Sequence, residues 1–224
     1  GRHRALDTFQ LVDQLSGKTL GIRPDITPQV ARIDAHLLNR QGVTRLCYCG
    51  PVLHTRVSRA RASREPLQLG AEIFGHDGLE ADLEALDLAQ ALIQEAGLTG
   101  VRFDLGDARI FPAVLETTGL DARQQSELRD AMATKNQASV AALSQSLKPA
   151  VREALAFLVQ AYGDVSLLDE ANNALKAFPK ALKALDDLRW LARHLVNLSV
   201  SFDLADMSGY AYYTGVRFAA YSPG

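Results

Sequence analysis

The sequence predicts an α+β fold in which an antiparallel sheet is flanked by helices and interrupted by an all-helical insertion. Three observations support this prediction. Residues 44–53 and 64–74 alternate apolar and polar side chains with the period of two that is typical of strands. Residues 108–195 are instead rich in Ala, Leu, Gln and Lys. Residues 196–204 and 210–221 return to strand character, so the sheet is expected to continue after the helices.

The chain up to Gly42 predicts a β-hairpin followed by a helix. Two extended runs flank a turn at Ser16-Gly17-Lys18. Thr27 directly precedes Pro28, which is the pattern of an N-cap residue followed by proline at the first helical position. The helix is expected to end near Gly42. Its apolar stripe would consist of Val30, Ile33 and Leu37.

The segment R-E-P-L-Q-L-G-A-E-I-F-G, residues 64–75, is the most informative stretch. Gln68, Gly70 and Glu72 are two residues apart, so they share one face of a strand. An amide and a carboxylate on a half-buried face could recognise a small cation such as an amino group, or the face could simply be solvated. Residues 44–53 and 64–74 are expected to form an antiparallel pair, because a long polar loop joins them.

The helical segment carries repeated helix stops and starts. They lie at Gly119, Asn136, Pro149, Gly163 and Pro179. Before it, a helix is expected from Asp77 to Gly97 and a strand around Phe103. Several short helices placed between two strand regions favour an insertion into a sheet over a repeating βαβ pattern.

Composition excludes several classes of function. The chain has 224 residues and a formal net charge of -2, which argues against a broad nucleic-acid footprint. No apolar run approaches the length of a membrane span. Cys47 and Cys49 would lie on one face of a strand, so neither a disulfide framework nor a zinc site is expected. No Gly-rich nucleotide motif is present, and the five histidines show no metal-ligand spacing, so no cofactor or metal is expected. The beginning at Gly1, without Met, suggests a piece of a longer protein.

Three further stretches could carry chemistry, each beside a plainer interpretation. Asp25 and Thr27 could bind a cation at a helix N-terminus, or could form a turn and a cap. The basic loop 56–64 could hold a phosphate or carboxylate, or could be a solvated loop or a contact for a partner protein. Tyr212 and Tyr213 would face opposite sides of a strand, one offering a hydroxyl to a ligand, or the strand could be an aromatic core strand.

These stretches together resemble the catalytic core of class II histidyl-tRNA synthetases. They are more similar still to the regulatory subunits of ATP phosphoribosyltransferase, which are related to those synthetases. The motifs that carry the resemblance are R-P-D-I-T-P at 23–28, G-P-V-L-H-T-R at 50–56, R-E-P-L-Q-L-G-A-E-I-F-G at 64–75 and F-D-L-A-D-M-S-G-Y-A-Y-Y-T-G at 202–215. The resemblance covers nearly the whole chain and weakens in the helical insertion. It implies a class II synthetase-like core at 1–107 and 197–224, with the helical insertion at 108–196.

The resemblance also implies a histidine pocket. Asp25 and Thr27 match the residues that hold the α-amino group, and Gln68 matches the glutamine beside them. Glu72 matches the glutamate that contacts the imidazole, and Tyr213 matches the tyrosine on its other side. Tyr212 is expected to be a further histidine-binding residue. A carboxylate at one imidazole nitrogen and a hydroxyl at the other fit the two-sided hydrogen bonding of histidine.

The resemblance indicates that amino-acid activation is lost. A synthetase carries an arginine and, two places on, a glutamate where this chain has His54 and Arg56. It carries another arginine where this chain has Ser208, and an aspartate where it has Ala211. Removing positioned cations beside a developing phosphate charge typically costs orders of magnitude in rate.

The implied function is therefore that of a non-catalytic regulatory subunit in the first step of histidine biosynthesis. It would pair with the short-form catalytic subunit of ATP phosphoribosyltransferase in the cytoplasm, as a homodimer within a hetero-oligomer, and transmit feedback by histidine. No nucleic-acid or membrane partner is expected. The alternative is an active histidyl-tRNA synthetase or other histidine-activating enzyme, and a weaker one is a synthetase-like domain of a larger sensor.

Overall fold

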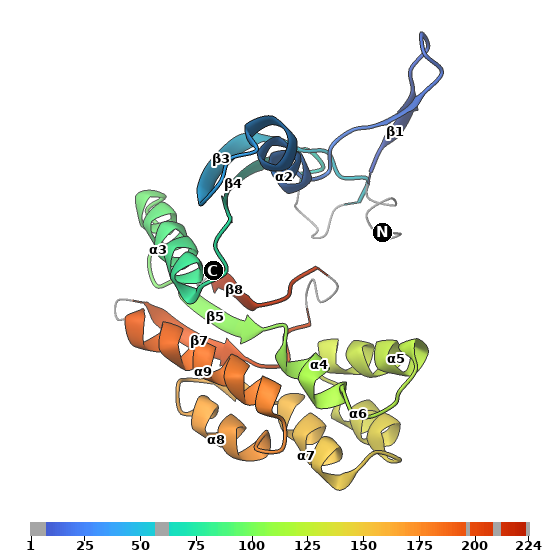
Figure 1. The fold of residues 1–224 in the computed structure, drawn as a ribbon, viewed down its shortest axis with the longest axis vertical. Coiled ribbons are helices and arrows are strands. Elements are labelled where there is room, and N and C mark those ends of the chain that lie inside the picture. The colour runs from blue at the N-terminus through green and yellow to red at the C-terminus, as the bar shows by residue number, and fades with distance from the viewer. Residues whose placement is uncertain (1–7, 57–62, 196–197, 208–211, 223–224) are drawn as a thin grey trace. The chain divides into compact units, whose positions relative to one another are not determined.

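The computed structural model describes residues 8–56, 63–195, 198–207 and 212–222 (Figure 1). The chain divides into two compact units, Gly1–Ala81 and Asp82–Gly224. The first unit begins with β1 (Gln10–Val12), which pairs antiparallel with β2 (Thr19–Gly21), so the predicted hairpin is confirmed. All six strand residues are exposed.

The predicted helix is present as α2 (Thr27–Ile33), which continues as the π-helical turn η1 (Asp34–Leu38). Asn39, in the left-handed conformation with φ of 43°, ends it before Gly42. Val30 is buried, whereas the side chains of Ile33 and Leu37 are 39% and 77% exposed. The predicted apolar stripe is therefore wrong beyond its first member. A π-helical turn breaks the 3.6-residue period on which the stripe was based.

The other pair of the first unit is formed by β3 (Thr44–Pro51) and β4 (Leu67–Phe74), antiparallel as predicted. Gln68, Gly70 and Glu72 share one face, again as predicted, but this polar face is the better covered one. It lies on the side of α2, where Ile26, Val30 and Val52 form a small core. The opposite face leaves Leu67 and Leu69 exposed by 70% and 59%.

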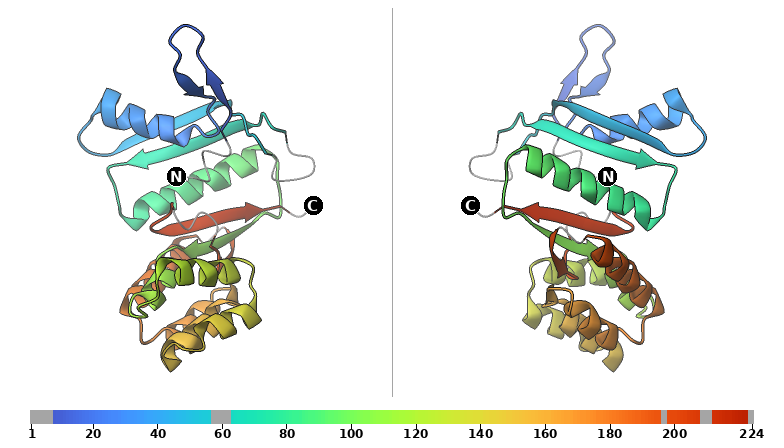
Figure 2. Two further views of the ribbon diagram at one scale, coloured as in Figure 1. Left: turned by 90° about the vertical axis from the view of Figure 1, so that its right-hand side faces the viewer. Right: turned by 90° about the vertical axis from the view of Figure 1, so that its left-hand side faces the viewer.

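The second unit is built on a four-stranded sheet with the order β6-β7-β5-β8. Its strands are β5 (Arg102–Asp107), β6 (Tyr162–Gly163), β7 (Ser199–Asp203) and β8 (Val216–Tyr221). β5 pairs antiparallel with β8, and β6 pairs antiparallel with β7. β5 and β7 run parallel, which requires a long crossover between them. Six helices supply this crossover, and in both views of Figure 2 they lie together on one side of the β5–β8 pair.

The helix boundaries follow the predicted stops. α3 (Leu79–Glu95) ends before Gly97, as expected. The crossover helices are α4 (Ile110–Leu115), α5 (Ala122–Ala133), α6 (Gln137–Ser144), α7 (Pro149–Leu158), α8 (Leu167–Ala174) and α9 (Pro179–His194). Asn136 caps α6 by accepting a hydrogen bond from the backbone N–H of Ser139 at 3.0 Å. Asp121 and Gln124 form a capping box at α5, which the sequence analysis missed.

The expected aromatic strand at 210–221 is shorter than predicted. β8 begins only at Val216, because its partner β5 ends opposite it at Asp107. Tyr212 and Tyr213 therefore precede the strand, and no strand among the described residues pairs with them. The prediction that they alternate across a strand, with one in the core, is wrong, since their side chains are 54% and 47% exposed.

The core of the second unit lies between the sheet and the crossover helices. Its largest fully buried side chains include Phe103 and Phe202 from the sheet and Phe111 from α4. Helix α9 contributes Leu185, Leu188 and Leu191, none of which is exposed. α9 packs against α4 and against β5, so it connects the helices to the sheet.

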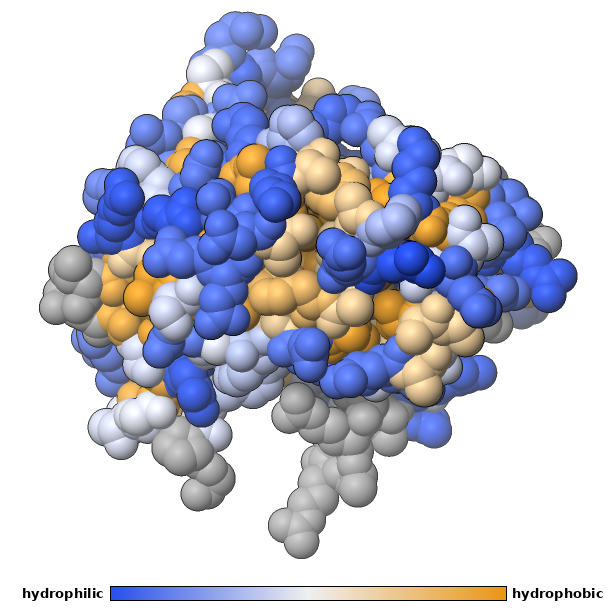
Figure 3. Space-filling model, turned by 90° about the horizontal axis from the view of Figure 1, so that it is seen from below, coloured by the Kyte–Doolittle hydropathy of each residue, from blue (hydrophilic) through white to orange (hydrophobic). Residues whose placement is uncertain are grey.

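The surface seen in Figure 3 is mixed. Hydrophobic residues form a band across the middle of that face, and hydrophilic residues border it. Mixed surfaces are normal for folded chains, which cannot cover themselves with polar atoms alone. Within the part of the chain that the structure describes, no helix combines the length and the apolar character that crossing a membrane requires.

Replacing Leu188 by Ala should destabilise the protein by roughly 2–5 kcal/mol, because the Leu188 side chain on α9 is fully buried and its loss would leave a cavity in the core. Urea unfolding followed by circular dichroism measures this. The matched control is Leu143→Ala on α6, whose side chain is 38% exposed and whose loss should cost much less. Equal losses for the two variants would contradict the assignment of α9 to the core.

Candidate functional site

The loop before α2 is fastened to the end of β3. The carbonyl oxygen of Arg23 accepts a hydrogen bond from the backbone N–H of Leu53 at 3.0 Å. The Nε2 atom of His54 lies 3.0 Å from the carbonyl oxygen of Pro24. The guanidinium of Arg23 in turn donates from Nε to the carbonyl oxygen of Pro51 at 3.0 Å. These contacts hold the residues before Asp25 in place, and they occupy His54 with a structural bond.

Gln68 links this loop to β4 through both ends of its amide. Its Oε1 accepts from the backbone N–H of Ile26 at 2.9 Å, and its Nε2 donates to Oδ1 of Asp25 at 3.0 Å. The same Oδ1 accepts from the backbone N–H of Thr27 at 3.0 Å. Among the described residues, the hydrogen bonds to Asp25 all reach Oδ1, so Oδ2 is left for another donor.

Thr27 does not cap α2, contrary to the prediction. The N-cap position belongs to Ile26, which has no side-chain cap, and Thr27 is the first helical residue. The side chain of Thr27 instead donates to Oε1 of Glu72 at 2.7 Å. Asp25 has taken over the backbone contact at this end of the helix, which releases the threonine hydroxyl for Glu72.

Glu72 is held in the same manner as Asp25. Thr27 donates to its Oε1, and the hydroxyl of Tyr48 lies 3.4 Å from the same oxygen. Among the described residues, these bonds reach only Oε1, which leaves Oε2 available. Four predicted site residues, Asp25, Thr27, Gln68 and Glu72, therefore come together on one half-buried surface in the first unit.

We name this surface the carboxylate face and define it by these four residues. Each carboxylate has one oxygen fixed by protein donors and one oxygen available. Each available carboxylate oxygen can accept a hydrogen bond. The surface therefore suits a ligand that carries two N–H donor groups, either charged or neutral. The arrangement can therefore hold such a ligand through hydrogen bonds and charge alone.

Tyr48 lies beside the carboxylate face and was not among the predicted site residues. Its hydroxyl lies 2.9 Å from Oγ1 of Thr27. Tyr48 stands directly opposite Gly70 in the β3–β4 pair. The alternation of β3 places Leu46, Tyr48 and Gly50 on one face, which could have drawn attention to it. The register across the long loop is what aligns it with Glu72, and the sequence alone does not contain that register.

Tyr212 and Tyr213 belong to the second unit. Their rings pack edge to face with centroids 5.2 Å apart. The guanidinium of Arg217 lies 5.0 Å from the ring centroid of Tyr213, a cation–π distance. Tyr213 also lines a cavity of about 590 Å³ together with Arg109, Lys180 and Lys183.

The cations of this cavity already have partners. Arg109 binds Asp107 and Asp187, and its hydrogen bonds to Asp107 raise its pKa, so it stays charged. Lys183 lies 3.5 Å from Asp187, and Lys180 binds Glu116. The positive charge that lines the cavity is therefore largely neutralised.

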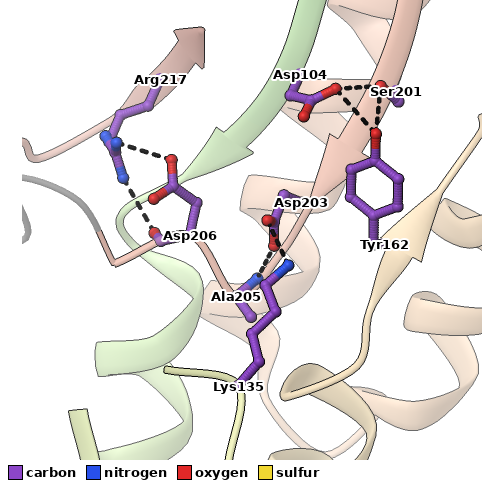
Figure 4. Close-up of polar contacts among 8 residues, drawn as sticks. All are labelled: Asp104, Lys135, Tyr162, Ser201, Asp203, Ala205, Asp206 and Arg217. Carbon is purple, nitrogen blue, oxygen red and sulfur yellow. Dashed lines mark hydrogen bonds and ion pairs between the residues drawn. The ribbon is translucent and has the colours of Figure 1, made fainter. Parts of the chain in front are cut away.

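A polar network precedes the two tyrosines and anchors their segment (Figure 4). Asp203 accepts from Lys135 at 2.7 Å and from the backbone N–H of Ala205 at 3.0 Å. Arg217 of β8 donates to the carboxylate of Asp206 at 2.8 Å and to its carbonyl oxygen at 3.0 Å. Asp104, Tyr162 and Ser201 form a second group on neighbouring strands. The network ties residues 203–206 to β8 and to the C-terminal end of α5.

Several predicted features lie outside the described residues. They include Ser208 and Ala211, which were matched to synthetase residues, and positions 57–62 of the basic loop. Arg56 at the start of that loop is exposed.

The family model of histidyl-tRNA synthetase matches residues 1–224. The chain belongs to this family. Within the family it is similar to proteins named ATP phosphoribosyltransferase regulatory subunit. The one from Acidovorax sp. is 53% identical over 226 residues and the one from Verminephrobacter eiseniae is 54% identical over 226 residues. Each alignment covers 100% of this chain and 59% of the relative, so the chain spans about three fifths of their length.

A solved structure agrees with this family membership. The crystal structure of an ATP phosphoribosyltransferase regulatory subunit/histidyl-tRNA synthetase from Bacillus halodurans C has a TM-score of 0.85 and is 28% identical. The match covers 97% of this chain and 58% of that one. The predicted class II synthetase-like α+β fold and the predicted resemblance to these regulatory subunits are thereby confirmed.

Replacing Gln68 by Ala should destabilise the protein by about 1–3 kcal/mol, since the backbone N–H of Ile26 and one contact of Asp25 would lose their partner. Urea unfolding measures the change. The control is Gln14→Ala in the exposed β1–β2 turn, which should have almost no effect. If Gln68→Ala lowered the free energy of unfolding no more than Gln14→Ala does, the role of Gln68 in linking β4 to the loop before α2 would be contradicted.

The hydroxyl of Tyr48 should lose its proton at a higher pH than that of an ordinary tyrosine. Burial raises its pKa above 10.0, and the charges of Glu72 and Asp25 add to the rise. Because the folded-state pKa is the higher one, the contribution of Tyr48 to stability is complete below pH 10 and is lost as the pH rises through the folded value. The test is an alkaline absorbance titration of the wild type minus that of Tyr48→Phe. A difference curve centred at or below pH 10 would refute the shift.

Proposed function

We propose that this chain is the synthetase-like part of a non-catalytic regulatory subunit of ATP phosphoribosyltransferase. The observation that carries the proposal is the similarity, above 50% identity, to relatives named as that subunit. A regulatory subunit acts on a catalytic one, so the expected partner is the short-form catalytic chain. The subunit would act in the cytoplasm as a homodimer within a hetero-oligomer. The core would comprise residues 1–107 and 197–224, with 108–196 inserted. The pairing of β7 and β8 with β5 supports that division.

The effector in this proposal is histidine, bound at the carboxylate face. The α-ammonium group would meet Asp25, beside Thr27 and Gln68, and the imidazole would meet Glu72. In support, both carboxylates are held through one oxygen and keep the other available. Histidine carries two nitrogen-bearing groups that can satisfy such a pair. The proposal also assigns Tyr212 and Tyr213 to histidine binding, on the family resemblance of their segment.

Histidine can regulate the assembly only through a difference in affinity. If it binds one arrangement of the hetero-oligomer more tightly than another, it shifts the population toward that arrangement by no more than this difference. Feedback inhibition then requires that the favoured arrangement be the less active one. No bond of histidine needs to be made or broken, so reversible binding is sufficient for this role.

Replacing Glu72 by Gln should weaken histidine binding roughly 10-fold to 100-fold, because a charge-assisted hydrogen bond becomes a neutral one. Isothermal titration calorimetry of the full protein, alone and with its catalytic partner, measures this. Glu65→Gln is the control, since Glu65 is exposed on the same unit. Absence of histidine binding by the wild type in both settings, or equal affinity for Glu72→Gln, would overturn the pocket.

Two assays test the subunit role itself. Formation of phosphoribosyl-ATP by the catalytic chain should rise when this subunit is added and should fall as histidine is titrated in. Histidine-dependent exchange of pyrophosphate into ATP should be at background. Clear exchange would favour the alternative, a histidine-activating enzyme, which the family model also describes.

A further inference from the structure

A tyrosine lies across a glycine in the middle of the carboxylate face. Tyr48 on β3 is directly opposite Gly70 on β4, and Gly70 stands between Gln68 and Glu72 on the same side of its strand. A Cβ atom at Gly70 would overlap the phenol oxygen and the Cζ atom of Tyr48. The glycine therefore provides the space that the ring occupies.

The hydroxyl groups of this surface form a directed chain. Thr27 has one hydroxyl proton, and it donates that proton to Oε1 of Glu72 at 2.7 Å. In the 2.9 Å contact between Thr27 and Tyr48, the tyrosine must then be the donor. The direct distance from Tyr48 to Glu72, 3.4 Å, is too long for a strong hydrogen bond. Tyr48 therefore acts on Glu72 through Thr27.

A packing role alone would not need the hydroxyl. The ring of Tyr48 packs against the small core of Ile26, Val30 and Val52, and phenylalanine would fill that space equally well. The polar atom is placed instead where it donates a hydrogen bond to the hydroxyl oxygen of Thr27. Without this donor, the threonine side chain could turn to other rotamers, and its proton would no longer be directed at Glu72.

We infer that Tyr48 is a positioning residue of the histidine site, which orients Thr27 and Glu72 for the imidazole, and that Gly70 is required to admit it. The inference rests on the proposed function. It assigns part of the affinity for the ligand to a residue that need not touch the ligand. The orientation of Glu72 depends on the hydroxyl of Tyr48 and on the absence of a side chain at position 70.

The first test is Tyr48→Phe, which removes one oxygen and keeps the ring. Histidine affinity should fall roughly threefold to tenfold, the usual effect of one lost hydrogen bond. Tyr162→Phe is the matched control, because Tyr162 also donates its hydroxyl to protein oxygens, in the second unit. It should bind histidine as the wild type does.

A double-mutant cycle separates positioning from packing. Thr27→Val removes the hydroxyl through which Tyr48 acts, so adding Tyr48→Phe in that background should cause no further loss of affinity. Additive losses would show that Tyr48 does not act through Thr27 and would overturn the inference. Unchanged affinity of Tyr48→Phe in the wild-type background would overturn it as well.

Gly70→Ala provides a second route. It should weaken histidine binding in the wild type, because the ring must move, but it should have little effect in a Tyr48→Ala background, where the overlap is absent. Equal effects in both backgrounds would contradict the role of Gly70. Histidine binding by the wild type with no response to any of these variants refutes this inference alone. Absence of binding by the wild type refutes the proposed function and this inference together.

Discussion

The register between β3 and β4 is the constraint on which the carboxylate face depends. It sets Tyr48 opposite Gly70 and Leu46 opposite Glu72. A shift by one residue would turn Gln68 and Glu72 to the exposed face and bring Leu67 and Leu69 to the side of α2. Two features oppose such a shift. The tyrosine ring fits only across a glycine, and Gln68 is bonded to the backbone at the start of α2.

The same contacts join elements that are distant in the sequence. Asp25 and Thr27 come from the start of α2, while Gln68 and Glu72 come from β4, more than 40 residues later. The protein holds each carboxylate through one oxygen only. If protein donors bonded both oxygens of each carboxylate, the ligand-free state would be stabilised. If they bonded neither oxygen, the side chains would not be held in one orientation. The observed arrangement orders the side chains and still leaves them able to bind.

The sequence predicted the elements well where local signals are strong. The helix boundaries at Asn136 and Pro179 follow from capping chemistry. The β3–β4 pair follows from the alternation of apolar and polar residues. It failed where tertiary contacts decide. Thr27 has the pattern of a cap, but Asp25 competes for that role. The residues around Tyr213 have the sequence pattern of a strand. β5, however, ends at Asp107 opposite Val216, so it does not extend far enough to pair with Tyr213. Tyr48 could not be assigned, because a long loop leaves the register open.

The parallel pairing of β5 with β7 has a consequence for the order of folding. Asp104 and Ser201, which are partners in this pair, are 97 residues apart. Closing so long a segment costs chain entropy before any strand contact repays it, whereas α4 to α9 make mostly local contacts. The helices between the strands should therefore form early and shorten the effective loop. The insertion would then also lower the entropy cost of bringing β5 and β7 together.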